Sequence, residues 1–340
     1  MNGLTFNKIE SGEKYNDFII KNKGSFIQAP FYGSWHENLG KSVCRFSVEE
    51  DGKVLAYVQA IEVSLPFGQK YFYAPYGPVL NIDDTEKVLP FLKEGLTKLL
   101  KDRNGIFFRL DFNPTLDDGV LKKYFNKASR ATYKGSYFQP RAEWILDLTK
   151  PIEKITKEFH QKTRYSIRLA ERKNSEIEII SENFKEYFDV FVKLMNATSK
   201  RNGFTLHPEE YYKEVFKSIE EKKNGFLTIS KIDREVVGVF LFITYGKEAM
   251  YLYGASGDSY RKVPYSHKAQ FESIKHAKSL GLEKYNFGGI SSNENKVPSL
   301  KKLTLYKKRF GGETLNHSSF FDIVNKKIWY KLFVLRKMMK

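Results

Sequence analysis

The segment LYKKRFGG, Leu305–Gly312, places three consecutive cations between two aromatic residues and directly before two glycines. If it is an extended strand, Lys307 points to the opposite side from Tyr306 and Lys308, because side chains alternate along a strand. One lysine could then enter a ligand site while the other stays in solvent. An oriented ammonium group stabilises a developing oxyanion. When the segment is taken alone, a solvated basic turn is the favoured interpretation.

A carboxylate and a cation occur together in the strand-like segment Ile106–Phe112. Asp111 follows Arg109 by two residues, so both side chains are expected on one face of the strand. One interpretation is a structural Arg–Asp ion pair. The other is a carboxylate that holds or deprotonates an incoming amine.

Two further patterns place polar groups on a single face. Tyr251 and Tyr253 alternate with apolar residues, so we expect both on one side of a strand, either in a core or lining a cleft. Arg164, Arg168 and Arg172 recur every four residues and share one face of a helix. A solvated helix face is the ordinary interpretation, and contacts with nucleotide phosphates or a tRNA backbone are the alternative.

The elements that must position these residues follow one plan twice, at an offset of close to 180 residues. Beginning at Asp51 and at Asp233, an apolar strand is followed by an aromatic strand, a helix with an apolar stripe and another strand. This predicts an α/β protein with two domains, residues 1–145 and 146–340. A helix from about residue 151 to 172 joins them. No long heptad run occurs, so no coiled-coil arm is expected.

Composition limits the classes of function. The chain has 340 residues and 57 Lys plus Arg against 40 Asp plus Glu, a formal charge of +17 that favours polyanionic partners. The single cysteine, Cys44, excludes an internal disulfide and a cysteine-based zinc site. The six histidines show no metal-ligand spacing, so no metal is predicted. No signal-peptide pattern and no bilayer-length apolar run occur, so we expect a cytoplasmic protein.

Six segments, in order over nearly the whole chain, resemble a known family. They are SFIQAPFY, YFYAPYGPV, KTRYSIRLAERK, YLYGAS, EKYNFGGI and YKKRFGG. Together they are similar to the tandem GNAT-like (acyl-CoA N-acyltransferase-like) domains of the FemABX family of peptidoglycan-bridge aminoacyltransferases. The resemblance implies two such domains packed around a cleft. It also implies transfer of an amino acid from aminoacyl-tRNA to the stem peptide of a UDP-linked or lipid-linked peptidoglycan precursor, without a cofactor.

The resemblance also implies roles for individual residues. Lys307 takes the lysine place of the family's Phe-Lys-x-x-Phe-Gly-Gly pattern, and with it we assign catalytic roles to Lys307 and Asp111. The expected substrate contacts are Tyr251, Tyr253, His207, Tyr211, Arg109, Trp35 and His36, and the expected tRNA or phosphate contacts are Arg164, Arg168, Arg172 and Lys308. Two places depart from the pattern. Trp35 or His36 stands where some members carry a lysine, and His207 precedes Tyr211 where some carry an arginine.

Two other functions remain open. A coenzyme A-dependent N-acyltransferase is one, but a GNAT that uses acetyl-CoA carries a glycine-containing pyrophosphate loop at the start of a helix. Here the sequence after YLYGAS reads GDSYRKVPYSHKA, without such a glycine pair. A non-catalytic RNA-binding protein that uses the +17 charge is the other. We expect the protein to be a monomer.

The C-terminal segment Asn325–Lys340 has a helical pattern. Ile328, Leu332, Leu335 and Met339 form one stripe, which Trp329 and Phe333 widen, and six cations flank it. A terminal helix docked on its own domain through this stripe is the simpler interpretation. An amphipathic helix on an anionic bilayer is the alternative.

Overall fold

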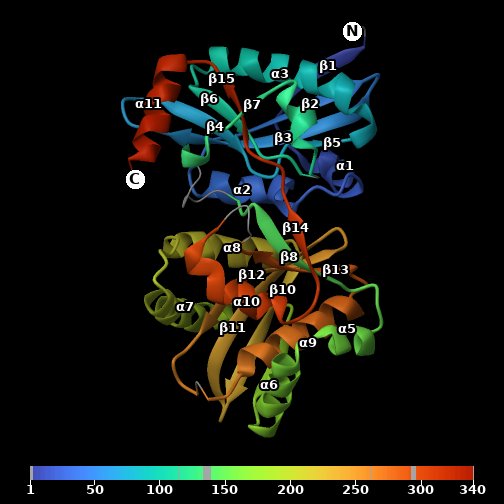
Figure 1. The fold of residues 1–340 in the computed structure, drawn as a ribbon, viewed down its shortest axis with the longest axis vertical. Coiled ribbons are helices and arrows are strands. Elements are labelled where there is room, and N and C mark those ends of the chain that lie inside the picture. The colour runs from blue at the N-terminus through green and yellow to red at the C-terminus, as the bar shows by residue number, and fades with distance from the viewer. Residues whose placement is uncertain (1–2, 114, 133–138, 261, 292–295, 340) are drawn as a thin grey trace. The chain divides into compact units, whose positions relative to one another are not determined.

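The computed structural model describes residues 3–113, 115–132, 139–260, 262–291 and 296–339, and it separates into two compact units. The first unit contains residues 1–141 and 316–340, and the second contains residues 142–315. Both are α/β units built on one sheet each (Figure 1). Within the described residues, no helix is long and apolar enough to cross a membrane.

The sheet of the first unit has the order β1-β2-β3-β4-β6-β15-β7, with β5 paired to β3. Its strands are β1 (Leu4–Ile9), β2 (Val43–Glu50), β3 (Lys53–Ser64), β4 (Lys70–Ala74), β5 (Val79–Leu80), β6 (Phe107–Leu110), β7 (Asn126–Lys127) and β15 (Phe321–Val324). Strands β4 and β6 run parallel, and the other described pairs are antiparallel. A parallel pair requires a crossover, which here is a helix.

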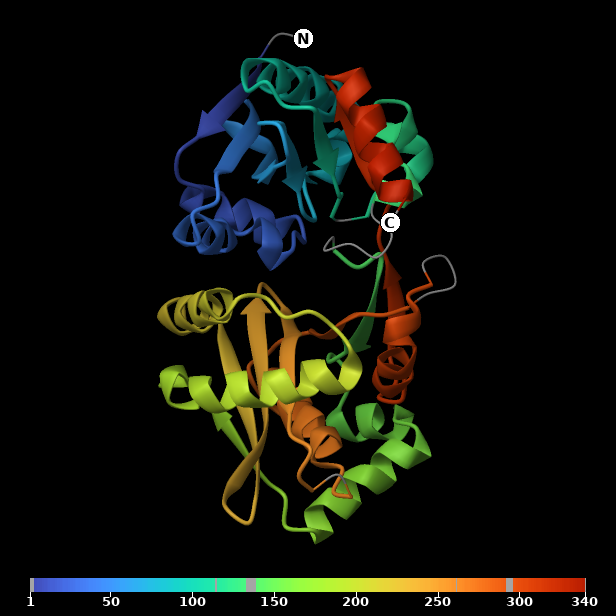
Figure 2. The ribbon, with the colours of Figure 1, turned by 90° about the vertical axis from the view of Figure 1, so that its left-hand side faces the viewer.

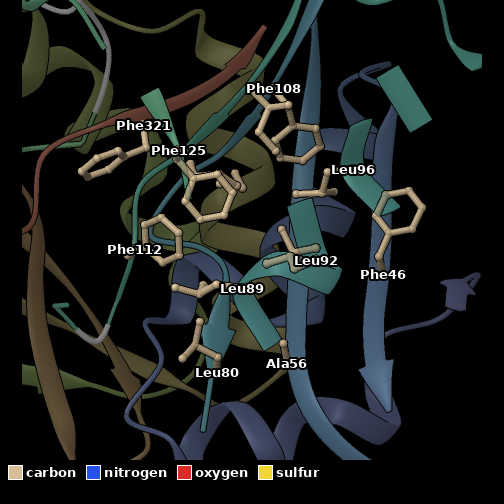
Figure 3. Packing of buried hydrophobic residues seen from close by; sticks show 14 of the residues in the cluster. Phe46, Ala56, Leu80, Leu89, Leu92, Leu96, Phe108, Phe112, Phe125 and Phe321 are labelled. Carbon is tan, nitrogen blue, oxygen red and sulfur yellow. The ribbon is translucent and has the colours of Figure 1, made fainter. Parts of the chain in front are cut away.

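Helices cover both faces of this sheet. They are α1 (Asn16–Lys21), α2 (Pro30–Asn38), α3 (Thr85–Asp102), α4 (Asp118–Lys122) and α11 (Lys327–Met338). The apolar stripe of α3, including Leu92 and Leu96, packs on one face against Phe46 and Phe108 (Figure 3). On the other face, Phe333 of α11 packs against Tyr71 and Phe107. The sheet is therefore buried on both sides, which accounts for its many aromatic residues.

The second unit repeats the plan, with the sheet order β14-β8-β13-β12-β11-β10-β9. Its strands are β8 (Ala142–Asp147), β9 (Glu176–Ile180), β10 (Gly225–Ile232), β11 (Glu235–Tyr245), β12 (Glu248–Ser256), β13 (Lys284–Gly289) and β14 (Glu313–Asn316). Strands β12 and β13 are parallel, as are β4 and β6 in the first unit. The helices are α5 (Ile152–Glu158), α6 (Gln161–Arg172), α7 (Phe188–Asn202), α8 (Glu209–Glu221), α9 (Tyr265–Ser279) and α10 (Lys301–Lys308). Helices α7 and α8 cover one face, and α6 and α9 cover the other (Figure 2).

The C-terminal segment lies in the first unit, not in the second as its place in the sequence suggested. Strand β15 pairs with β6, and α11 packs on the same sheet. The boundary therefore falls at residues 141 and 142, with residues 316–340 returned to the first unit, rather than at residues 145 and 146. Strand β15 occupies beside β6 the place that β8 occupies beside β13. Each sheet is thus completed by a strand that is remote in sequence.

The single helix expected over residues 151–172 is two helices, α5 and α6. Phe159 between them is extended (ψ 139°) and buried against Phe271 and Phe310. His160 then caps α6, because its side chain accepts a hydrogen bond from the Lys162 backbone N–H (3.1 Å). The continuous apolar pattern concealed this break, since Phe159 is buried in either geometry.

Candidate functional site

Lys307 lies in a helix, which corrects the strand expected for this segment. It is in the last turn of α10, where side chains point about 100° apart rather than alternating. Lys307 is buried (4% exposed), and its Nζ donates a hydrogen bond to the Gly289 carbonyl oxygen (2.7 Å) at the end of β13. Lys308 is exposed, with its Nζ 5.1 Å from the Trp144 ring centroid. The two lysines therefore occupy different environments on one helix.

A network of buried polar side chains lies beside Lys307. Glu143 on β8 is paired in register with Gly289, whose carbonyl accepts the Lys307 hydrogen bond. Asn286 on β13 donates to Glu143 (3.2 Å) and to Glu248 on β12 (3.0 Å). The Asn286 side chain also accepts from the Gly288 backbone N–H (2.7 Å). Asn286 therefore connects the three neighbouring strands β8, β13 and β12.

Gly288 shapes the backbone at this point. Its φ of 74° lies in the left-handed region, and the β8–β13 register shifts between Asn286 and Gly289. A glycine adopts this conformation without the steric cost of a Cβ. The Gly289 carbonyl beyond the irregularity is the acceptor for the Lys307 ammonium.

Burial and a nearby carboxylate together bring the pKa of the Lys307 side chain close to neutral pH. Burial lowers the pKa of Lys307 to about 8, and the nearby Glu143 carboxylate opposes this shift. Desolvation disfavours the charged amine, whereas an opposite charge favours it. An ammonium has three N–H donors, and the Gly289 carbonyl is one acceptor for them. Lys307 can therefore donate to a ligand oxygen or exchange a proton with a ligand.

Tyr251 and Tyr253 lie on opposite faces of the sheet, which corrects the expectation that they share one. The β11–β12 register shifts between Leu241 and Phe242, so Tyr251 is paired with Phe242 and Tyr253 with Leu241. This bulge inserts one extra residue and breaks the alternation. Tyr251 packs in the core on the α9 side, with its ring 5.4 Å from that of Phe242.

On the opposite face, Tyr253 belongs to an aromatic cluster with residues that precede and begin α8. Its hydroxyl donates to the Tyr211 hydroxyl (3.3 Å), and the Tyr211 ring stacks on His207 at 4.2 Å. Sequence reasoning expected these three residues at a substrate site, and the structure brings them together. It missed Tyr212, whose hydroxyl accepts from the His207 backbone N–H (3.3 Å) and whose ring lies edge-on to Tyr253. The YY pair in the sequence was the available signal.

Asp111 and Arg109 both lie in the first unit but do not pair with each other, so the interpretation of the two as one structural ion pair is wrong. Arg109 is fully buried and donates to Asp322 of β15 through Nε (2.8 Å) and Nη2 (2.7 Å). Asp111, also buried, forms an ion pair with Arg141 and accepts from the Tyr73 hydroxyl (3.0 Å). Arg109 is thus part of a core ion pair, and we do not include it in the proposed site.

Trp35 and His36 lie on α2, where both are buried within the first unit. The Trp35 ring packs against Phe26, Phe31 and Tyr32. His36 lies edge-on to Tyr32 at 4.8 Å. The two side chains therefore form part of an aromatic cluster rather than projecting from the helix.

The three arginines of α6 have different surroundings. Arg164 donates to the backbone carbonyls of Lys157 (3.1 Å) and Phe159, at the end of α5. It therefore satisfies carbonyl groups that a helix terminus leaves without intrahelical donors. Arg168 and Arg172 are exposed, and the Arg172 guanidinium lies 6.0 Å from the Tyr165 ring centroid.

A cavity of about 420 Å³ opens beside the N-terminus of α9. Its lining residues are Arg201, Ser256, Gly257, Val263, Pro264, Tyr265, Ser266 and His267. The Arg201 guanidinium is engaged by Asp258 (2.8 Å) and by the Ser256 hydroxyl (2.8 Å). Burial, followed by the charge of Arg309, lowers the pKa of His267 to about 4, so this imidazole is neutral at pH 7. Among the described lining residues, Arg201 is thus the one cation, and it is already paired with Asp258 and Ser256.

These features define a class of protein. Two α/β units, each with one parallel strand pair joined by a helix and flanked by antiparallel strands, form a tandem GNAT-like fold. A model of the acetyltransferase (GNAT) domain matches residues 158–296, and a model of the FemAB family matches residues 11–124. The two matches lie one in each unit, and together they support assignment of the chain to the FemABX family.

Named relatives align with most of the chain. A UDP-N-acetylmuramoylpentapeptide-lysine N(6)-alanyltransferase from Weissella viridescens is 25% identical over 302 residues, covering 85% of this chain and 87% of that protein. A lipid II:glycine glycyltransferase from Staphylococcus epidermidis is 21% identical, covering 96% and 94%. The crystal structure of FemX superimposes with a TM-score of 0.81 at 20% identity, covering 96% of this chain and all of that one.

Proposed function

We propose that the protein is an aminoacyltransferase that moves an amino acid from aminoacyl-tRNA to the stem peptide of a peptidoglycan precursor. The observation that carries this proposal is the buried Lys307 ammonium, which donates to the Gly289 carbonyl at the end of β13, an inner strand of a GNAT-like sheet. The relatives named as alanyl- and glycyltransferases support the same reaction class. Both act, by name, on precursors that carry a stem peptide.

The proposed reaction needs a polarised carbonyl rather than a protein nucleophile. The acceptor amine attacks the ester carbonyl, a C–N bond forms, and the C–O bond to the terminal ribose of the tRNA breaks. The amine loses a proton and the ribose oxygen gains one. We assign to Lys307 the donation of a hydrogen bond to the oxyanion that develops on the carbonyl. Such a donor acts most strongly in a desolvated site, and Lys307 is buried.

We assign the remaining groups from their surroundings. Each Asp111 oxygen accepts one hydrogen bond, from Arg141 or from Tyr73, and can accept another, so we propose that Asp111 is an amine-binding carboxylate of the first unit. The cluster His207, Tyr211 and Tyr253 is the proposed acceptor surface. Arg168, Arg172 and Lys308 are exposed cations and are the proposed contacts for RNA phosphates.

A direct assay tests the proposal. The protein is incubated with charged total tRNA and either a UDP-linked or a lipid-linked precursor, and the products are weighed by mass spectrometry. We expect a mass increase by whole amino-acid residues that requires charged tRNA. No increase with any charged tRNA and either precursor would contradict the proposal. The experiment also identifies the amino acid and the acceptor.

The alternative of a coenzyme A donor is tested by calorimetric titration. We expect no micromolar binding, because the single described arginine that lines the α9 cavity is already paired with Asp258 and Ser256. A pyrophosphate needs donors that are free to meet it. Micromolar binding of coenzyme A would instead favour an acyl-CoA-dependent enzyme. We propose a cytoplasmic location, where charged tRNA is present.

The pH dependence of turnover should report the titration of Lys307. The ammonium form stabilises the oxyanion, so we expect kcat to fall as the pH rises through about 8, the pKa of Lys307. Glu143→Gln removes the carboxylate that raises this pKa, so the falling limb should move to lower pH by roughly one unit. Glu248→Gln is the matched control, because Glu248 also accepts from Asn286 but lies on β12. Identical pH profiles for the wild type and Glu143→Gln would contradict the assignment.

A further inference from the structure

Helix α11 docks through one edge of its apolar surface and leaves its aliphatic stripe in solvent. Phe333 is buried, and its ring packs on Tyr71 and Phe107, while Trp329 and Tyr330 are partly buried beside them. The sequence pattern suggested docking through the stripe that contains Ile328, Leu332, Leu335 and Met339. These four side chains are instead 75%, 51%, 55% and 82% exposed. The helix therefore has a second apolar face, which the described residues of its own unit leave exposed.

The exposed apolar surface continues beyond the helix. Phe67, in the turn between β3 and β4, is 85% exposed, and its ring lies 6.3 Å from that of Trp329 in the first turn of α11. Lys326 also joins the two segments, because its Nζ donates to the Gln69 side chain (3.0 Å). We define the terminal patch as Phe67, Ile328, Leu332, Leu335, Met338 and Met339. All of these residues belong to the first unit.

The charged residues of the terminal segment all have one sign. Residues 326–340 contain six lysines and arginines and no aspartate or glutamate. Lys327, Lys331 and Arg336 are exposed on the same helix as the patch. An apolar helical stripe bordered by cations, without acidic residues, complements the surface of an anionic bilayer, in which phosphate groups surround an apolar interior. A soluble protein partner would have to be similarly acidic around an apolar groove.

We propose that the terminal patch docks the protein on anionic phospholipid membranes. The aliphatic stripe and Phe67 enter the boundary between headgroups and acyl chains, and the lysines and arginines contact lipid phosphates. Helix α11 then lies in the plane of the bilayer surface rather than crossing it. A consequence, which rests on the proposed function, is that membrane-bound enzyme would meet a lipid-linked acceptor more often than free enzyme would.

Vesicle co-sedimentation with the full chain tests the docking without tRNA or precursor, so its result is independent of aminoacyl transfer. Deleting α11 is unsuitable, because Phe333 covers Tyr71 and Phe107. The variant is therefore Leu332→Glu with Leu335→Glu, at exposed positions. The matched control is Ile20→Glu with Ile82→Glu, which adds the same charge at exposed sites (38% and 55%) in the same unit.

With vesicles of phosphatidylglycerol and phosphatidylcholine at low salt, we expect the wild type and the control to pellet. We expect the variant to partition at least about tenfold less, since two apolar side chains no longer enter the bilayer. Pure phosphatidylcholine vesicles should bind the wild type weakly, and added salt should weaken binding to the anionic vesicles.

Three results would overturn the proposal. The first is a wild type that stays in the supernatant with anionic vesicles. The second is equal binding by the variant and the control, which would assign the attraction to overall charge alone. The third is a wild-type dimer that the Leu332→Glu, Leu335→Glu variant converts to a monomer and that does not bind vesicles, which would make a second copy of the chain the occupant of the patch.

Discussion

Replacing Lys307 by Met is expected to reduce kcat by about 100-fold to 1,000-fold, with precursor affinity nearly unchanged. The ammonium is buried and donates to the Gly289 carbonyl, and another of its N–H groups can donate a hydrogen bond to the carbonyl of an ester substrate. Methionine fills a similar volume without a donor. The loss should therefore appear in the transition state rather than in substrate binding, and steady-state kinetics with charged tRNA measures it.

Lys308→Met is the control for this experiment. Lys308 is the next residue on α10, carries the same charge and is exposed near the Trp144 ring. Its replacement should leave kcat within about twofold of the wild-type value, because the interaction of an exposed cation with an aromatic ring contributes only modestly to the free energy. A folded Lys307→Met protein with near-normal turnover would remove Lys307 from the mechanism. A large loss in both variants would point to a general effect of charge on tRNA binding instead.

Replacing Asp322 by Asn is expected to lower the free energy of unfolding by about 3–5 kcal/mol. Arg109 and Asp322 are both fully buried, and the guanidinium donates twice to the carboxylate. Removing one charge leaves the other without its counter-ion in the core, which costs more than the intact pair contributes. The Tyr330 hydroxyl of α11 also donates to Asp322 (2.7 Å), so the attachment of that helix should weaken too. Urea unfolding followed by circular dichroism measures the change.

Asp258→Asn is the matched control for stability. Asp258 also pairs with an arginine, Arg201, but its side chain is 52% exposed. An exposed pair contributes about 0–1 kcal/mol, so this variant should unfold close to the wild type. Equal, small effects of both substitutions would show that the Arg109–Asp322 pair does not hold β15 in the first sheet.

Local patterns in the sequence determined most of the secondary structure and the repeated plan. The last strand of the second copy of the plan is β13 (Lys284–Gly289), and the C-terminal helical pattern is α11. The order of strand, strand, helix and strand recurs in both units. It could be predicted because each element has an apolar periodicity that is visible in its own sequence. The segments resembling the FemABX family likewise stand in the sequence itself, so the family could be identified without coordinates.

The tertiary structure alone decided which remote residues meet. Asp322 reaches Arg109 because β15 returns to the first sheet more than 200 residues later, and such pairing leaves no local pattern. The bulge that separates Tyr251 from Tyr253 depends on the register between β11 and β12, which periodicity does not specify. Lys307 is helical because residues 301–308 bury Thr304 and Lys307 on one side, a spacing that eight residues of mixed polarity did not reveal.

The orientation of α11 is the clearest example of what the sequence determines and what the tertiary structure determines. The sequence determined an amphipathic helix, since its apolar residues recur at helical spacing. It did not determine which apolar residues face the protein, because Phe333 and Leu332 are adjacent and both are hydrophobic. The sheet determines which residues are buried. Tyr71 and Phe107 form an aromatic surface on which Phe333 packs, and the aliphatic stripe stays exposed to solvent. Periodicity specifies that a helix has an apolar face, whereas the shape of the surface that receives it specifies which side chains are buried.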